Sequence, residues 1–468
     1  MDVDALSRLQ FALTASFHFL YPPLSMGVGL MLVVMGILYM RTRDPKWRRL
    51  SFFWVKIYGL IFALGVATGV VQEFEFGMNW AEYSRFVGNI FGSLLAAEGV
   101  FAFFLEGGFL GLMLFGGNRL GPKMWLFATF MVVFGAHFSA LWIVMANSWM
   151  QTPAGYTIQA TPPPTRAYMT DFASVMFTPS FLQRIFHVFF ASWTAGAAMV
   201  LSVGAYYLLR KRHVEVAKSM VKIGLIGFVI FGAVNFFAAG PLQAIEVTNE
   251  QPIKLASMEG LWETQSCAPL YLVGWVNEAE QTTTGISIPC LLSFLAYSDF
   301  QATVTGLNDF PPAQYPPINL VFQVYHIMFD LGGLFVLLGA VGLLFYLWKR
   351  KVYNMRWLLW LFVIGVVFTI AAIIAGWWTA EVGRQPWIVW GLLETADAVS
   401  PNLTATDVAI SLVMFLVLYT ILFIVFIVLL NRKIQDGPEK LADVETVPVS
   451  SLPDSFREVF RRRGARAS

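Results

Sequence analysis

Charged residues are scarce in this chain of 468 residues. Asp, Glu, Lys and Arg together make up 13% of it, apolar residues make up 57%, and the mean hydropathy is +0.65. A soluble domain has roughly 25% charged residues. The shortage excludes an ordinary soluble protein and indicates a membrane protein. The net charge is only +2 and the basic residues are spread over separate loops, which excludes nucleic acid as a partner.

Long apolar runs account for most of the sequence. A transmembrane helix needs about 20 predominantly apolar residues. Runs of this kind recur at 12–40, 52–72, 90–116, 124–146, 181–209, 219–239, 317–347, 357–378 and 407–430. The sequence therefore predicts an all-α integral membrane protein of about nine transmembrane helices. We expect one transmembrane domain over 1–433 and a mobile cytoplasmic tail over 434–468.

Basic residues are distributed unevenly between the connections. Stretches rich in Lys and Arg follow the first, third, fifth and seventh spans and end the chain: RTRDPKWRR, NRLGPK, RKRHVEVAK, KRKVYNMR and FRRRGAR. The opposite connections hold only Arg8, Arg85, Arg166, Lys254 and Arg384. Because Lys and Arg mark the cytoplasmic side, the N-terminus is predicted outside and the C-terminus inside. The acidic start and the lack of a small-residue cleavage site argue against a cleaved signal peptide.

The sequence has no visible internal repeat, which disfavours an inverted-repeat transporter. Its one large extramembrane segment is the predicted outer loop at 241–316, which several prolines interrupt. The only two cysteines, Cys267 and Cys290, both lie in this loop. A disulfide is permitted on the oxidising side, but sequence does not establish that the two residues are close enough to pair.

Few polar residues occur within the spans, and each is a functional candidate because burying an ionisable group in a membrane is costly. The candidates are His18, Glu98, Glu106, His187, His326, Met328 and Asp330, with Glu381 and Arg384 just beyond the eighth span. A lone histidine in a span is as often a packing residue as a ligand, and His137 is expected to be structural. A functional role is expected for Glu98 and Glu106, because their span holds no Lys or Arg.

Four of these candidates share a predicted depth. His18, Glu98, His187 and Met328 lie roughly six to eleven residues from the outer ends of their apolar runs, or about 9 to 17 Å at 1.5 Å per residue. Glu381 lies slightly above this layer. Residues that only pack helices together have no reason to share a depth. Haem suits the layer, because its iron takes His or Met as axial ligands and helical bundles hold such cofactors in their core.

Four segments resemble subunit I of the cytochrome bd oxidases, and the similarity runs from Arg8 to about residue 430. RLQFALTASFHFLYPPLSMG resembles the family's first span, and NIFGSLLAAEGVFAFFLE resembles its third span with two glutamates. GWWTAEVGRQPW matches the specific GWxxxExGRQPW motif, and KLASMEGLWETQ is similar to the quinol-loop motif. The loop lacks a long insertion, so the chain resembles the short-loop members.

The resemblance implies a role for each matching residue. His187 and Met328 would be the axial ligands of a low-spin haem b. His18 would ligate one haem of a high-spin pair and Glu381 the other, with Glu98 beside them. Glu106 would belong to a proton route, and Lys254 and Glu259 would contact quinol. Arg384 would offset a propionate or the Glu381 charge, and Trp377 of the same motif would contact a cofactor.

The resemblance also implies the cofactors, the partners and the location. We expect a low-spin haem b, a high-spin haem b, and either haem d or a further haem b. The implied partners are a second large subunit, quinol, oxygen and membrane lipid, and a small single-helix subunit is left open. The implied location is the bacterial cytoplasmic membrane. Quinol would be oxidised at the outer loop and oxygen reduced with cytoplasmic protons, which charges the membrane without pumping.

One residue departs from the family pattern. Members usually have Arg two residues before the ligand methionine, where this chain has His326. Residues two apart on a helix point about 200° from each other, so His326 and Met328 cannot both face one iron. We expect Met328 to be the ligand, and His326 could pair with Asp330 four residues later.

Three other classes of protein fit the sequence less well. A haem–copper oxidase needs more histidines than the five present, and the chain has no His-His pair. A cytochrome b electron carrier would need paired histidines on facing helices, which His18, His137 and His187 do not supply. A haem-free transporter that relays ions through Glu98, Glu106 and Asp330 remains open on composition, but it leaves the shared depth unexplained.

Overall fold

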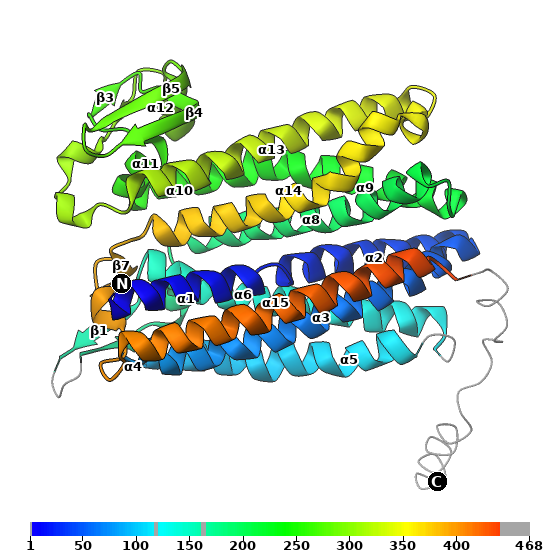
Figure 1. The fold of residues 1–468 in the computed structure, drawn as a ribbon, viewed down its shortest axis with the longest axis horizontal. Coiled ribbons are helices and arrows are strands. Elements are labelled where there is room, and N and C mark those ends of the chain that lie inside the picture. Colours follow the sequence, from blue (N-terminus) through cyan, green and yellow to red (C-terminus); the bar gives the residue numbers. More distant parts are fainter. Residues whose placement is uncertain (1, 117–119, 161–164, 440–468) are drawn as a thin grey trace, which may run out of the picture.

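The computed structural model describes residues 2–116, 120–160 and 165–439. Within these ranges, nine helical segments are long and apolar enough to cross a membrane, as the sequence predicts: Val3–Thr42, Pro45–Met78, Ala81–Phe115, Pro122–Gln151, Phe172–Leu209, Val214–Glu250, Ile318–Leu347, Arg356–Val382 and Ala405–Asp436. They run alongside one another in one elongated bundle (Figure 1). Most extend past the predicted apolar runs, because polar turns continue the helices at their ends.

Several segments combine two or more helices. The elements are α1 (Val3–His18) with α2 (Pro22–Thr42), α3 (Pro45–Met78), α4 (Ala81–Ala97) with the π-helical turn η1 (Glu98–Phe103) and α5 (Phe104–Phe115), α6 (Pro122–Gln151), α7 (Phe172–Met176) with α8 (Phe181–Leu209), α9 (Val214–Val234) with the π-helical turn η2 (Asn235–Ala239) and α10 (Gly240–Glu250), α13 (Ile318–Leu347), α14 (Arg356–Val382) and α15 (Ala405–Asp436).

The connections contain short helices and four two-stranded antiparallel sheets. The helices are α11 (Pro252–Glu259) and α12 (Leu291–Tyr297), with 3-10 turns at Leu307–Asp309, Pro312–Gln314, Lys351–Asn354 and Ala396–Ala398. The strand pairs are β1 (Tyr156–Gln159) with β2 (Arg166–Met169), β3 (Gln265–Ser266) with β6 (Thr303–Val304), β4 (Leu270–Asn277) with β5 (Thr282–Ile288), and β7 (Trp387–Val389) with β8 (Leu393–Glu394).

Among the described residues, four of the spanning segments are interrupted, and the fifth breaks between α7 and α8. The first breaks between α1 and α2, where Pro22 and Pro23 start the second helix, since proline lacks an N–H and suits a first helical turn. The third and sixth contain the π-helical turns η1 and η2. Such turns occur frequently at functional sites. His18 is the last residue of α1 and Glu98 is the first of η1, so two candidate residues lie at interruptions.

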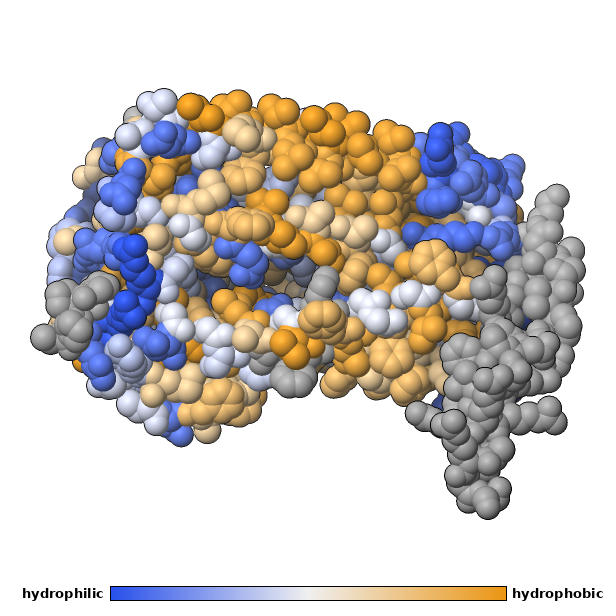
Figure 2. All heavy atoms as spheres, turned by 90° about the horizontal axis from the view of Figure 1, so that it is seen from below, coloured by the Kyte–Doolittle hydropathy of each residue, from blue (hydrophilic) through white to orange (hydrophobic). Residues whose placement is uncertain are grey.

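The bundle has two distinct ends. The N-terminus and the segment from α11 to β6 lie at one end, called here the loop end, and the connection from α2 to α3 lies at the other (Figure 1). On the face shown in Figure 2, apolar side chains cover the middle and hydrophilic ones gather at both ends. That distribution is typical of a protein surrounded by lipid. The assignment of the loop end to the outside stays a prediction.

The main hydrophobic core lies where α2, α3, α8 and α9 meet. At its centre the backbones of α2 and α8 touch. A Cβ atom on Gly27 would lie 2.2 Å from the Ser192 carbonyl oxygen, and one on Gly196 would lie 2.1 Å from the Gly27 carbonyl carbon. Only glycine fits at both positions, and small residues of this kind let membrane helices approach closely. The contact fixes the helix that follows His18 against the helix that carries His187.

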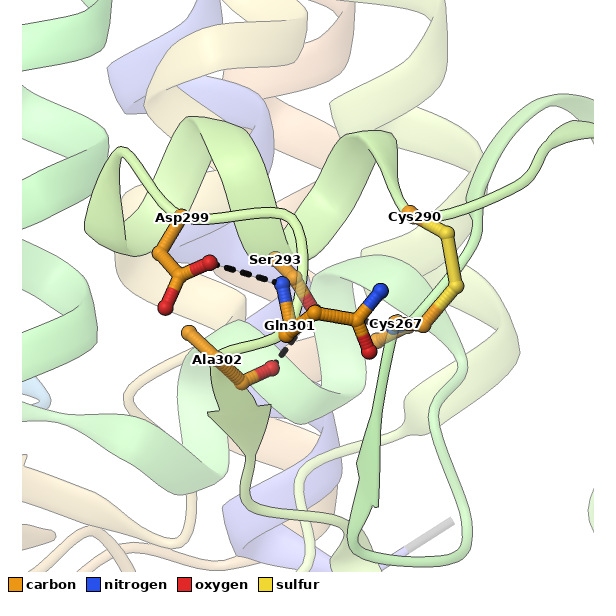
Figure 3. Close-up of a disulfide and its surroundings, with 7 residues drawn as sticks. Cys267, Cys290, Ser293, Asp299, Gln301 and Ala302 are labelled. Atoms are coloured by element: carbon orange, nitrogen blue, oxygen red, sulfur yellow. Dashed lines mark hydrogen bonds between the residues drawn. A yellow bond between two sulfur atoms is a disulfide. The ribbon is translucent and has the colours of Figure 1, made fainter.

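The loop after the sixth span is a small folded unit. The helical structure of the sixth span continues past the predicted start of this loop at 241, since α10 ends at Glu250. The two cysteines form a disulfide, Cys267–Cys290, which joins the segment after β3 to the start of α12 (Figure 3). Ser293 supports the same corner, since its hydroxyl accepts a hydrogen bond from the Ala268 N–H and donates one to the Ala302 carbonyl. The hairpin β4–β5 is thus tied at its base.

The final helix also extends past the prediction. The predicted tail begins at 434, whereas α15 ends at Asp436. The mobility expected for the tail concerns mainly residues 440–468, which lie outside the described residues. Near that boundary, Glu439 contacts the third span, where the Arg49 side chain donates to its carbonyl and Lys56 pairs with its carboxylate.

Candidate functional site

One connected cavity runs through the bundle. Its volume is about 1810 Å³, larger than the roughly 300–1,000 Å³ of a site for one drug-sized ligand. Its lining is mostly apolar, and it includes every residue that the sequence predicts for the site: His18, Glu98, Glu106, His187, Lys254, Glu259, Met328, Trp377, Glu381 and Arg384. The structure therefore brings together residues from seven separate helices and the turn after the eighth span.

The predicted shared depth is wrong in its detail. His18 ends a helix of 16 residues, and Glu98 follows the 17 residues of α4, so both lie more than eleven residues from their helix starts. The estimate failed because α1 and α4 begin well before their apolar runs. What these residues share is that they line the cavity. Their distance from the helix ends is only an approximate guide to that.

The His18 side chain has a defined tautomer. Its Nδ1 lies 2.9 Å from the Thr68 hydroxyl, and that hydroxyl donates its own proton to the Leu64 carbonyl at 2.7 Å. Thr68 must therefore accept from Nδ1–H, which leaves the Nε2 lone pair free. A second partner that fixes the tautomer is the usual arrangement for a histidine that binds a metal.

His187 and Met328 also have the properties of ligands. The buried Nδ1 of His187 has no hydrogen-bond partner among the described residues. Gly240, directly after η2, lies beside this ring, since a Cβ there would be 3.8 Å from Nδ1. The Met328 sulfur lies against α14, where a Cβ on Gly376 would approach it to 2.6 Å. Both side chains line the cavity.

The remaining histidines in the spans are fully engaged elsewhere. His137 accepts from the Trp193 indole N–H at 2.8 Å through Nε2 and lies 2.7 Å from the Val133 carbonyl through Nδ1. His326 has its two ring nitrogens 2.8 and 2.9 Å from the Phe322 and Tyr271 carbonyls. Neither residue lines the cavity.

These contacts bear on the expectations for His137 and His326. His137 is structural, as expected. The suggested pairing of His326 with Asp330 amounts to an electrostatic interaction, because backbone carbonyls occupy both ring nitrogens and no direct ion pair joins the two side chains in the described part of the chain.

The two glutamates of the third span each have one hydroxyl donor. Ser139 donates to Glu98 at 2.6 Å, and Tyr58 donates to Glu106 at 3.1 Å. Glu106 is buried, with 7% of its surface exposed. Neither carboxyl forms an ion pair among the described residues. Both can therefore gain or lose a proton without breaking a salt bridge.

Glu381 lies in a polar cluster at the loop end of the cavity. Arg384 donates to its Oε2 at 2.5 Å, and the Asn147 amide donates to its Oε1 at 2.8 Å. Arg184 in turn donates to the Asn147 carbonyl oxygen. Because each carboxylate oxygen has two acceptor positions, Oε2 keeps one lone pair for a further partner.

Lys254 and Glu259 are buried rather than solvated, and each is only 1% exposed. Lys254 donates to the side chains of Gln151 and Gln251. Burial, with added repulsion from Arg184 and Arg384, holds the Lys254 pKa well below its usual range, although nearby carboxylates oppose this. The two residues face different neighbours, because residues five apart on the helix α11 point about 140° from each other.

Glu259 is the more isolated of the pair. Neither of its carboxyl oxygens has a hydrogen bond of good geometry within the described residues, although the Tyr325 hydroxyl is near enough to interact with it. Burial raises the Glu259 pKa to about 8, and Tyr325 partly opposes the rise. A carboxyl with a pKa near neutrality is suited to accept and release protons.

The sequence did not identify the residues that hold the candidates in place. Thr68, Ser139, Tyr58 and Asn147 are polar residues within spans, but nothing local distinguishes them from packing residues. Arg184 had a signal, since it precedes His187 by three residues in FLQRIFHVFF and thus lies on the same helix face.

Similarity to known proteins covers the whole described bundle. Residues 6–438 match the family model of cytochrome bd terminal oxidase subunit I. The chain is 37% identical to cytochrome bd ubiquinol oxidase subunit 1 of Bacillus subtilis (strain 168), with 98% of this chain and 99% of that protein covered. It is 34% identical to cytochrome bd-II ubiquinol oxidase subunit 1 of Escherichia coli (strain K12), with 94% and 98% covered.

A solved structure agrees with these sequence relatives. The bd oxidase from Geobacillus thermodenitrificans superimposes with a TM-score of 0.87 at 30% sequence identity, and the match covers 93% of this chain and 99% of that chain. Fold and sequence thus give the same relationship.

Proposed function

The chain belongs to the cytochrome bd terminal oxidase subunit I family, and on that premise we propose a role for each group in its cavity. Membership makes it part of a quinol:oxygen oxidoreductase, a multi-pass protein of the bacterial inner membrane that works with a second large subunit. Haems and quinol are the cofactors and substrate of this family.

The cavity would hold three haems. His187 and Met328 would ligate a low-spin haem b from α8 and α13. His18, through its free Nε2, and Glu381, through its unshared Oε2 lone pair, would hold the high-spin pair, a haem b with either haem d or a further haem b. When bound, these groups carry single electrons and reduce oxygen. Trp377 and Arg384, which also line the cavity, would pack against them and balance their charge.

Quinol would react beside α11 at the loop end. Oxidation of quinol to quinone releases two protons and two electrons. Glu259 would accept a proton, because its carboxyl has only the nearby Tyr325 hydroxyl as a partner among the described residues and its pKa of about 8 lies near neutrality. Lys254 would orient the quinol oxygen from another part of the wall. The protons would leave at this end, which is predicted to be outside.

Protons for oxygen reduction would arrive from the opposite end. Glu106 lies farther from the loop end than Glu98 along the same interrupted helix. It would pass protons onward with the help of the Tyr58 hydroxyl, and Glu98, bound by Ser139, would receive them at the oxygen site. Oxygen reduction then charges the membrane without a pumping step, because its protons and the quinol protons are handled at different ends.

The observation that carries this assignment is the convergence of all the predicted residues on one cavity. A reduced-minus-oxidised spectrum of the purified complex tests it. We expect bands of low-spin and high-spin haem together. A haem-free transporter would give no bands, and a cytochrome b electron carrier would give low-spin bands without oxygen consumption. Mass spectrometry of the same preparation would establish whether a small single-helix subunit accompanies the second large one.

A further inference from the structure

Three basic side chains meet at the loop end of the cavity. Arg184 comes from α8, Lys254 from α11, and Arg384 from the turn after α14. Their side chains are almost fully buried, with 8%, 1% and 3% of their surfaces exposed, and all three line the cavity. We call these three residues the basic cluster. Cations buried to this extent need compensating partners.

The described residues satisfy the basic cluster only in part. Arg184 donates to Asn147, and Arg384 donates to Glu381 and to the Trp387 carbonyl. The Nε of Arg184 and the Nη1 of Arg384 are buried and have no acceptor within the described residues. A guanidinium has five N–H donors, so each side chain retains capacity for a further acceptor.

Few groups compensate the charges of the basic cluster. Glu381 is ion-paired with Arg384, and Glu246 interacts electrostatically with Arg184 and Lys254 without a direct ion pair among the described residues. Burial is the main cause of the low Lys254 pKa, and repulsion from the two arginines adds to it. Both arginines keep a buried N–H group without an acceptor in the described part of the chain, and an anion in the cavity would supply one.

We propose that the two arginines of the basic cluster bind the carboxylate groups of the haem whose iron His187 holds, with Arg184 as the main contact. The inference rests on the proposed function. Arg184 and His187 are three residues apart on α8, so both side chains leave the helix on one face toward the cavity. Haem carries two carboxylate-ended side chains, and a guanidinium binds a carboxylate through two parallel hydrogen bonds. Arg184 is a positioning residue that holds the cofactor without ligating the iron.

A free carboxylate ion from the medium could bind the arginines in the same way as a haem carboxylate. The test must therefore distinguish these two sources of the carboxylate. Haem is labelled with ¹³C at its carboxyl carbons in the cells that make the complex. Redox-induced infrared difference spectra of the purified complex are compared with and without label, and the low-spin haem is titrated for its midpoint potential. The variants are Arg184→Gln and Arg184→Lys. Arg85→Gln is the control, because Arg85 lies on α4, is half exposed and pairs with Glu82.

Arg184→Gln should shift the carboxylate bands that respond to the label. It should also lower the reduction equilibrium constant of the low-spin haem about tenfold, or about 59 mV for one electron, because a nearby cation stabilises the reduced form. Arg184→Lys keeps the charge but loses the paired geometry, so the labelled bands should shift while the potential stays close to wild type. Arg85→Gln should change neither.

Each contrary result has its own meaning. Unchanged labelled bands and an unchanged potential in both Arg184 variants, with the low-spin band present, would overturn the proposal. The bands that shift in Arg184→Gln could instead be insensitive to the haem label and change when formate replaces acetate in the buffer. That result would show that the basic cluster binds a free anion, and it would also overturn the proposal. If Arg184→Gln does not assemble, Arg184→Lys alone decides through its labelled bands. A wild-type complex without a low-spin band would instead refute the proposed function.

Discussion

Two kinds of carboxyl group line the cavity, and their surroundings are opposite. Glu381 is ion-paired with Arg384 and hydrogen-bonded by Asn147, so its position and charge are fixed. Glu106 and Glu259 are each buried beside one tyrosine, Tyr58 and Tyr325 respectively, and have no ion pair among the described residues. A fixed charge suits a group that holds a cofactor, whereas an unpaired carboxyl suits a group that exchanges protons.

This contrast divides the cavity wall into holding groups and exchange groups. The proposed holding groups are His18, His187, Met328 and Glu381, and the proposed exchange groups are Glu106 and Glu259. Loss of a holding group should remove or alter a haem. Loss of an exchange group should slow turnover while the haems remain.

The largest expected effect is loss of a whole haem. His187→Ala or Met328→Ala should abolish the low-spin haem b band and leave the high-spin bands largely present, because the axial ligands fix the spin state. His326→Ala should only shift the low-spin band, since both of its ring nitrogens bind backbone carbonyls. Visible difference spectra measure all three variants. If His326→Ala abolished the band and Met328→Ala kept it, His326 would be the ligand in place of Met328.

Glu98 and Glu106 test the contrast between holding and exchange groups within one span. Glu106→Gln should keep the full haem content and slow oxygen consumption about 100-fold, the typical contribution of a proton-transfer group. Glu98→Gln should disturb the high-spin haem bands themselves, because Glu98 lies at the proposed oxygen site. Pyridine haemochrome content and oxygen-electrode rates measure both. Equal haem loss in the two variants would remove Glu106 from the proton route.

At the loop end, Glu259→Gln and Lys254→Ala should depress quinol-driven oxygen consumption and spare consumption driven by an artificial donor that bypasses the loop. Burial raises the Glu259 pKa to about 8, so its base form becomes populated as the pH rises through that value. The wild-type quinol rate should therefore rise between about pH 7 and pH 9, and Glu259→Gln should lose this dependence. Normal quinol kinetics in both variants would place the substrate elsewhere.

The smallest expected effect concerns the support of a holding group. Thr68→Val removes the acceptor that fixes the His18 tautomer but keeps the volume of the side chain. Second-layer changes of this kind typically cost about 10- to 100-fold in affinity or activity. We expect a shifted high-spin band with haem retained, and Thr68→Ser should restore the wild-type band. A spectrum of Thr68→Val identical to wild type would show that the hydrogen bond is dispensable.

His18, Glu98, Glu106 and His187 could be singled out from the sequence, because an ionisable residue in an apolar run is conspicuous, whereas Lys254 and Glu259 were indicated only by the resemblance of their loop motif. Nine spans followed from the same runs. The partners of these residues were not predictable, since they come from distant parts of the chain. Lys254 meets Gln151 across 103 residues, and Asn147 meets Glu381 across 234. Only packing decides such contacts, and the burial of Lys254 and Glu259 depends on them as well.

The two prolines that start α2 reduce the number of unpaired N–H groups where the first span is interrupted. A helix start normally presents unpaired N–H groups, and lipid offers them no acceptor. Pro22 and Pro23 have no N–H, so the first two positions of α2 carry no donor that needs one. Replacing both with alanine would add two such donors close to His18. The two prolines thus allow a helix break beside His18 within the membrane, where the unpaired N–H groups of most helix starts would need water.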